Sequence, residues 1–165
     1  MTSIDKKNAS PQDLAKIFWD YVARQCKDTH EDKVNLLHEF KDKPELDIIS
    51  EELIYLISCV VDYGLFLNLN VSPERDIVWD SYVEYIREFG VASMDLGSFV
   101  TRFRERYETY AELMDEASPK DIGKVFARFS GQEDHIIVVE LAAIEFVGAL
   151  EYINSIFDEF TVSCS

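Results

Sequence analysis

The chain has 165 residues, of which 47% are hydrophobic and 13% aromatic, and its 32 acidic and 16 basic residues give a formal net charge of −16. A composition this rich in apolar residues excludes a disordered acidic chain, and the length fits one domain with a substantial core. The acidity argues against binding to nucleic acid or to an anionic membrane surface, because both require a basic patch.

The N-terminal segment is polar and carries no targeting signal that we recognise. We expect residues 1–9 to be a disordered or loosely held N-terminus, residues 10–160 a single helical domain and residues 161–165 a C-terminal tail. The first ten residues lack the apolar core of a secretory signal. Cys26, Cys59 and Cys164 follow neither a disulfide nor a zinc pattern. These features predict a soluble cytoplasmic protein without disulfide bonds.

Along the chain, the starts of the predicted helices are well marked. Ser10-Pro11, Ser72-Pro73 and Ser118-Pro119 each place a capping hydroxyl before a proline at the first helical position, and Thr29 and Ser50 offer caps without proline. With the spacing of the apolar residues, these signals predict helices at 11–27, 30–41, 50–68, 73–89, 95–116, 119–129 and 133–160. The predicted fold class is all-α, a compact single-domain multi-helix bundle of about six or seven helices.

Two segments leave an α+β alternative open. Residues 65–71 alternate apolar and polar side chains, and residues 135–139 are dense in β-branched ones, so both also fit short strands.

The similarity between the segments that begin at Ser10 and Ser118 has two explanations as well. Either part of the chain was duplicated, or both segments meet the common requirements of a helix start.

The sequence contains no recognisable catalytic or cofactor-binding motif. It lacks the Glu-x-x-His pairs of di-iron bundles, the GxSxG nucleophile turn and the GxxxxGK[ST] phosphate loop. We therefore predict neither a metal nor a cofactor, name no catalytic residue, and favour a protein that is not an enzyme.

Asp62 is a carboxylate within the apolar stretch from Leu53 to Leu69. On a helical wheel it shares the one polar edge of this stretch with Glu51, Tyr55 and Ser58. Such a position favours a solvated or arginine-paired carboxylate over a catalytic one. Arg102 and Arg106, which stand one helical turn apart, are the predicted partners of Asp62 in a buried ion pair.

Acidic residues gather in two lines on predicted helices. The first acidic line consists of Asp76, Asp80, Glu84 and Glu88, and the second of Glu133, Glu140, Glu151 and Asp158. No lysine or arginine follows Arg128, so no base close in sequence offsets the second line. Each line is either a solvated face that keeps the protein soluble or a surface that attracts a basic partner.

Three functions compete on these observations. The favoured one is a non-enzymatic acidic helical interaction protein that binds a basic protein partner through the two acidic lines, as an inhibitor, an immunity-type antagonist or a chaperone does. The second is a small-ligand-binding or enzymatic domain with a pocket near Asp62. The third is a structural homo-oligomer built on the aromatic stripe from Phe99 to Tyr110.

Overall fold

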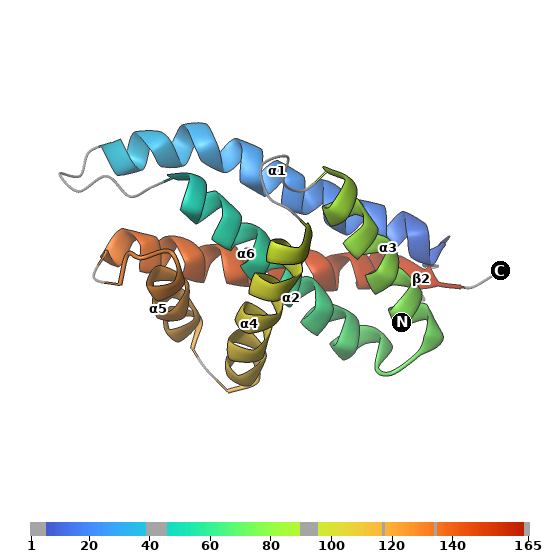
Figure 1. Ribbon diagram of the computed structural model, residues 1–165. Coiled ribbons are helices and arrows are strands. Elements are labelled where there is room, and N and C mark those ends of the chain that lie inside the picture. The colour runs from blue at the N-terminus through green and yellow to red at the C-terminus, as the bar shows by residue number, and fades with distance from the viewer. Residues whose placement is uncertain (1–5, 39–45, 90–95, 117, 134, 164–165) are drawn as a thin grey trace, which may run out of the picture.

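A computed structural model describes residues 6–38, 46–89, 96–116, 118–133 and 135–163, and their side chains except those of residues 27–38, 46–47, 89 and 96. Six helices follow one another in the described residues: α1 Pro11–His38, α2 Leu46–Leu69, α3 Pro73–Phe89, α4 Leu96–Met114, α5 Pro119–Phe129 and α6 Ile136–Glu159 (Figure 1). Two strands flank them, β1 Lys7–Ala9 and β2 Phe160–Val162. The all-α helical bundle predicted from the sequence is confirmed.

Three helix starts have the serine caps that the sequence predicts. The backbone N–H groups of Asp13, Arg75 and Asp121 donate to the hydroxyl oxygens of the serines three residues earlier, over 3.1, 3.2 and 3.3 Å. Each cap satisfies a backbone donor that has no partner within the helix, and the following proline has no N–H to lose. The starts of α1, α3 and α5 are therefore encoded locally.

Two other predictions of secondary structure are wrong. Residues 11–38 form one helix where two were predicted, at 11–27 and 30–41, since neither glycine nor proline interrupts it after Pro11; residues 39–41 of the second prediction lie outside the described residues. The α+β alternative also fails for its two segments. Leu65 to Leu69 complete α2, and residues 136–139 form the first turn of α6, where Val138 and Val139 are buried.

The strands instead lie at the two ends of the helical region. Lys7, Asn8 and Ala9 pair in parallel with Phe160, Thr161 and Val162. The sequence placed residues 1–9 and 161–165 outside the domain, and of these residues 1–5, 164 and 165 lie outside the described residues. Ala9 is buried, and the Lys6 ammonium donates to the Phe157 carbonyl over 2.7 Å. Three-residue strands paired across the whole chain leave no periodic signal in the sequence.

Helix α2 is the centre of the bundle. It contacts α1, α3, α4, α5 and α6, and every residue from Glu52 to Asp62 is buried (Figure 1). The segment Ile48–Leu69 is long and apolar enough to cross a membrane, but 72% of its apolar 18-residue stretch is buried inside the protein. Burial of this kind is typical of the core helix of a soluble protein.

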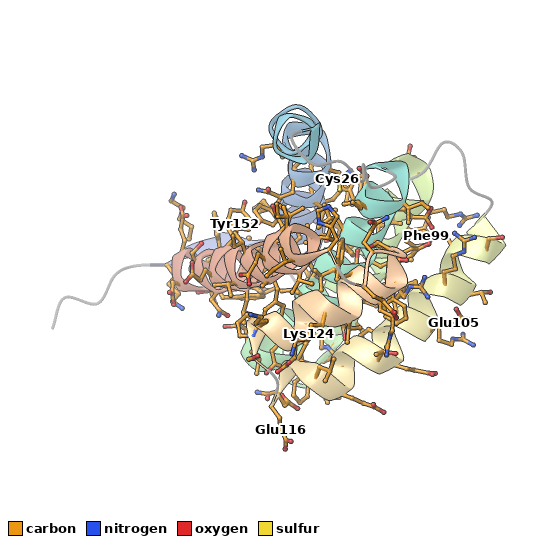
Figure 2. The ribbon with its side chains drawn as sticks, turned by 90° about the vertical axis from the view of Figure 1, so that its left-hand side faces the viewer. Cys26, Phe99, Glu105, Glu116, Lys124 and Tyr152 are labelled. Atoms are coloured by element: carbon orange, nitrogen blue, oxygen red, sulfur yellow. The ribbon has the colours of Figure 1, made fainter. Side chains whose placement is uncertain are left out.

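Helix α6 lies on α2 and also contacts α1 and α5. Tyr21 of α1 stacks on Tyr152 of α6 with 4.2 Å between ring centroids, and Figure 2 places Tyr152 on the side of α6 next to α1. On another side of α6, Gly123 of α5 lies directly against the backbone of Val139. A Cβ atom at Gly123 would lie 2.1 Å from the Val139 carbonyl oxygen, so only glycine permits this approach.

Replacing Gly123 by alanine should therefore push α5 away from α6 and lower the free energy of unfolding by about 2 to 3 kcal/mol. Urea unfolding followed by circular dichroism measures the change. Gly148→Ala is the matched control, because a Cβ there meets nothing closer than the Tyr21 hydroxyl at 3.9 Å. We expect the control to be neutral or slightly stabilising, since alanine has the higher helix propensity. Equal stabilities of the two variants would contradict the close packing of α5 on α6.

Candidate functional site

The buried face of α2 contains two carboxylates, and each is paired with an arginine from another helix. Glu52 is 3% exposed and accepts hydrogen bonds from Nε and Nη2 of Arg106 in α4, the shortest of 2.7 Å. The Arg106 guanidinium also covers the Phe129 ring, with its carbon 4.1 Å from the ring centroid. Burial raises the pKa of the Glu52 carboxyl above its ordinary value, while the hydrogen bonds and charge of Arg106 oppose that rise.

Asp62 is the second buried carboxylate, with 5% exposure. Its Oδ1 accepts a hydrogen bond of 2.9 Å from Nη2 of Arg75 in α3, and its Oδ2 accepts one from the Tyr107 hydroxyl of α4. Burial, followed by the hydrogen bond and charge of Asp62, raises the pKa of Tyr107 above its ordinary value. Asp62 therefore ties α2, α3 and α4 together.

The predicted pairing of Asp62 with Arg102 or Arg106 is not what the structure shows. The two arginines contact Glu51 and Glu52, at distances of 2.8 and 2.7 Å. Asp62 stands ten residues further along α2, about 15 Å away at a rise of about 1.5 Å per residue. Helix α4 crosses α2 (Figure 1), and the direction of that crossing decides which acids its arginines reach. Sequence spacing on α4 alone does not contain this information.

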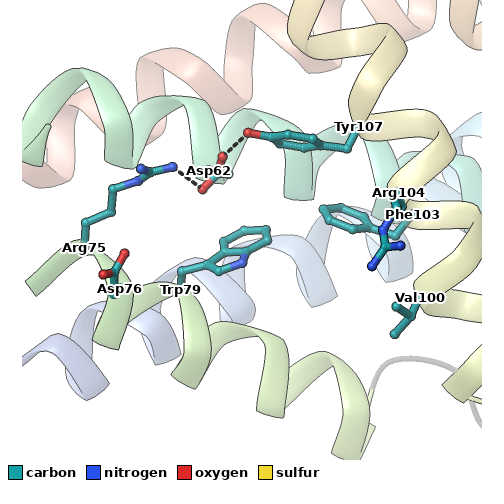
Figure 3. Close-up of a pocket in the computed structure, with 8 residues that line it drawn as sticks. All are labelled: Asp62, Arg75, Asp76, Trp79, Val100, Phe103, Arg104 and Tyr107. Carbon is teal, nitrogen blue, oxygen red and sulfur yellow. Dashed lines mark hydrogen bonds and ion pairs between the residues drawn. The ribbon is translucent and has the colours of Figure 1, made fainter. Parts of the chain in front are cut away.

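A pocket adjoins Asp62, as the small-ligand alternative required. Its volume is about 420 Å³, and it lies between α2, α3 and α4 (Figure 3). Residues from the three helices line it: Asp62, Arg75, Asp76, Trp79, Val100, Phe103, Arg104 and Tyr107. The aromatic side chains form its apolar part, with 5.8 Å between the ring centroids of Trp79 and Phe103.

The first acidic line lies on the exposed surface of α3. Asp76, Asp80, Glu84 and Glu88 are all exposed. Within the side chains that the structure describes, Glu84 alone of the four forms an ion pair, a 3.4 Å contact with the exposed Arg87. Exposed pairs of this kind contribute little stability, so most of the negative charge of the line remains available.

The second acidic line lies on the exposed surface of α6. Glu133 precedes the helix, and Glu140, Glu151 and Asp158 follow along it, all exposed. Lys120 of α5 lies 3.7 Å from Glu140, a partial offset that sequence distance did not reveal. Three large apolar side chains are exposed on the same helix: Ile136, Ile144 and Val147, at 65%, 68% and 37%. The sequence does not distinguish these three from the other apolar residues of this helix.

The aromatic stripe of α4 belongs largely to the core. Phe99 and Tyr110 are 6% and 0% exposed, and Phe103 and Tyr107 are partly buried. Figure 2 shows Phe99 where α4 meets the rest of the bundle, whereas Glu105 lies on the outer side of α4. The stripe therefore lacks the large exposed apolar surface that the homo-oligomer interpretation needed.

The described residues show no sign of metal or thiol chemistry. No group of three or more histidine, cysteine or acidic side chains gathers there as a metal site would require. Neither Cys26 nor Cys59 is in a disulfide bond, and burial raises the pKa of the Cys59 thiol well above its ordinary value. A thiol of this kind is a poor nucleophile.

Comparisons of the chain with protein-family models, with curated proteins and with solved structures found no match.

The two acid–arginine pairs at the start of α2 make a matched test of the buried geometry. Glu52→Gln leaves the Arg106 charge largely buried without its carboxylate and should lower the free energy of unfolding by about 3 to 5 kcal/mol. Glu51→Gln affects Arg102, whose side chain is 52% exposed, and should cost less than about 1 kcal/mol. Chemical denaturation of both variants measures the difference. Similar losses for the two variants would mean that Glu52 is more solvated than the structure shows.

Proposed function

We propose that this protein is a non-enzymatic acidic helical interaction protein that binds a basic protein partner through the outward surface of α6. The observation that carries the proposal is the mixture of acids and branched apolar residues on that surface. Six residues of this surface follow one another along the helix at steps of three, four or seven: Ile136, Glu140, Ile144, Val147, Glu151 and Asp158. We call these six residues the α6 outer face.

The α6 outer face has the periodicity of a seam between two helices. Steps of three and four residues keep side chains on one side of a helix, and the face extends over about 33 Å at a rise of about 1.5 Å per residue. Ile136 and Ile144 expose most of their surface to water in the free protein, which is unfavourable. An amphipathic helix of the partner would bury them.

The negative charge of the α6 outer face favours a basic partner. Glu140, Glu151 and Asp158 alternate with the apolar residues, and no lysine or arginine follows Arg128 in the chain. Lysine or arginine residues on the partner would pair with these carboxylates, and an acidic surface would be rejected. The first acidic line on α3 adds to the negative field that speeds the approach of such a partner. An inhibitor, an immunity-type antagonist or a chaperone acting in the cytoplasm would use a surface of this chemistry.

A catalytic role for Asp62 has less support, although the pocket beside it exists. Both carboxylate oxygens of Asp62 are already engaged, one by Arg75 and the other by Tyr107. A general base needs an oxygen that can reach a substrate proton. The pairing therefore favours a structural role for Asp62.

Two variants with equal charge changes test the proposed surface. One replaces Glu133, Glu140, Glu151 and Asp158 by Gln or Asn, and the other makes the same type of change at Asp76, Asp80, Glu84 and Glu88. Proteins captured from a lysate of the source cells are quantified by mass spectrometry at about 0.05 and 0.5 M salt. We expect the α6 variant to lose most of a salt-sensitive, predominantly basic set of proteins that the α3 variant still captures.

Ile144→Gln separates contact at the α6 outer face from simple charge attraction. It removes an exposed apolar side chain, leaves the net charge unchanged and should reduce capture of the same proteins about tenfold while leaving the unfolding transition in place. Equal losses in the two charge variants would instead assign binding to net charge alone. Capture that is unaffected by the α6 changes would overturn the proposal.

A further inference from the structure

The pocket beside Asp62 is an open groove on a different surface from the α6 outer face. Its walls come from α3 and α4, and α2 closes its base (Figure 3). Val100 is 43% exposed, and Asp76 and Arg104 are also exposed at its margin. A small-molecule site usually encloses most of its ligand, whereas a margin this exposed suits a chain segment that lies across the surface. We refer to it as the α3–α4 groove.

The base of the α3–α4 groove is held in a fixed arrangement. Asp62 contacts both Arg75 and Tyr107, so the charges of Asp62 and Arg75 largely offset each other. The Arg75 guanidinium also lies over the Phe66 ring, 5.6 Å from its centroid. Because these contacts join three helices, the groove is formed before any ligand arrives, and little ordering cost is left for binding.

The middle of the groove is apolar. Trp79 of α3 and Phe103 of α4 lie between its two charged ends, and the exposed Val100 stands beside Phe103 (Figure 3). Partly buried aromatic side chains in a groove are typical anchoring points of protein interfaces. A single aromatic or branched aliphatic side chain of a ligand would cover them.

The two ends of the groove carry opposite charges. Asp76 lies at the α3 end and Arg104 at the α4 end, with the aromatic side chains between them (Figure 3). Among the side chains that the structure describes, neither forms an ion pair or a hydrogen bond. Each therefore has its full capacity for a ligand group of opposite charge. The separation of the two charges along the groove favours an extended ligand over a compact one.

We propose that the α3–α4 groove binds a short extended peptide segment in which an aromatic or branched aliphatic residue stands between a basic and an acidic residue. The apolar residue covers Trp79, Val100 and Phe103, the basic residue pairs with Asp76, and the acidic residue pairs with Arg104. This assignment rests on the groove alone and does not depend on binding at the α6 outer face.

Selection from a displayed library of random linear peptides tests the assignment. On the wild-type protein, the enriched peptides should share one apolar residue flanked by opposite charges. Peptides selected on the Arg104→Glu variant should have a basic residue at the position that was acidic. Peptides selected on the Asp76→Lys variant should have an acidic residue at the position that was basic. Arg87→Glu and Asp80→Lys carry the same charge changes on exposed residues outside the groove and should retain the wild-type motif.

Fluorescence anisotropy with a synthetic peptide of the enriched motif then gives the size of the effect. This peptide should bind the Arg104→Glu variant about tenfold more weakly than it binds the wild-type protein. Replacing the acidic residue of the peptide by a basic one should restore its affinity for the variant. Absence of a shared motif, a motif without either charged position, or a motif unchanged by both groove variants would overturn the proposal. A failure of binding at α6 affects none of these outcomes.

Discussion

The structure depends on the burial of α2 together with its charges. An apolar helix surrounded by other helices is stabilised by the burial of its apolar side chains, but Glu52 and Asp62 enter the core with it. A buried carboxylate is costly unless it is paired and hydrogen-bonded. Arg106 of α4 and Arg75 of α3 supply those pairs, and they fix where α3 and α4 lie on α2. The α3–α4 groove follows from this constraint, because its base is the same cluster around Asp62.

The same pairing shapes the surface. Arg75, Arg102 and Arg106 contact acids of α2, so these bases are used inside the fold or at its edge. Most members of the two acidic lines keep no ion pair among the described side chains, and the excess negative charge therefore points outward on α3 and α6. On α6 that charge alternates with exposed isoleucines, a combination that solubility alone does not require. Ile136 and Ile144, at 65% and 68% exposure, leave more apolar surface open on α6 than Ile77, at 36%, leaves on α3.

Local chemistry made much of the fold predictable, whereas the site depends on tertiary arrangement. Ser10, Ser72 and Ser118 marked helix starts correctly, because a cap acts within three residues of itself. The cap signal at Thr29 misled, since an uninterrupted helix can absorb a capping residue in its interior. The partner of Asp62 could not be chosen from the spacing of Arg102 and Arg106, because the choice depends on how α4 crosses α2. The exposure of Ile144 could not be predicted from the sequence, because α6 is apolar on nearly every side and only packing reveals which side stays uncovered.

The α6 outer face is the proposed docking surface for a basic partner. Methyl NMR of protein labelled at the isoleucine δ1 positions tests it most directly, by titration with the basic partner. We expect large shift changes at Ile136 and Ile144, with the buried Ile122 and Ile153 as unaffected internal references. Changes confined to Ile77 on α3, with Ile136 and Ile144 unmoved, would contradict it.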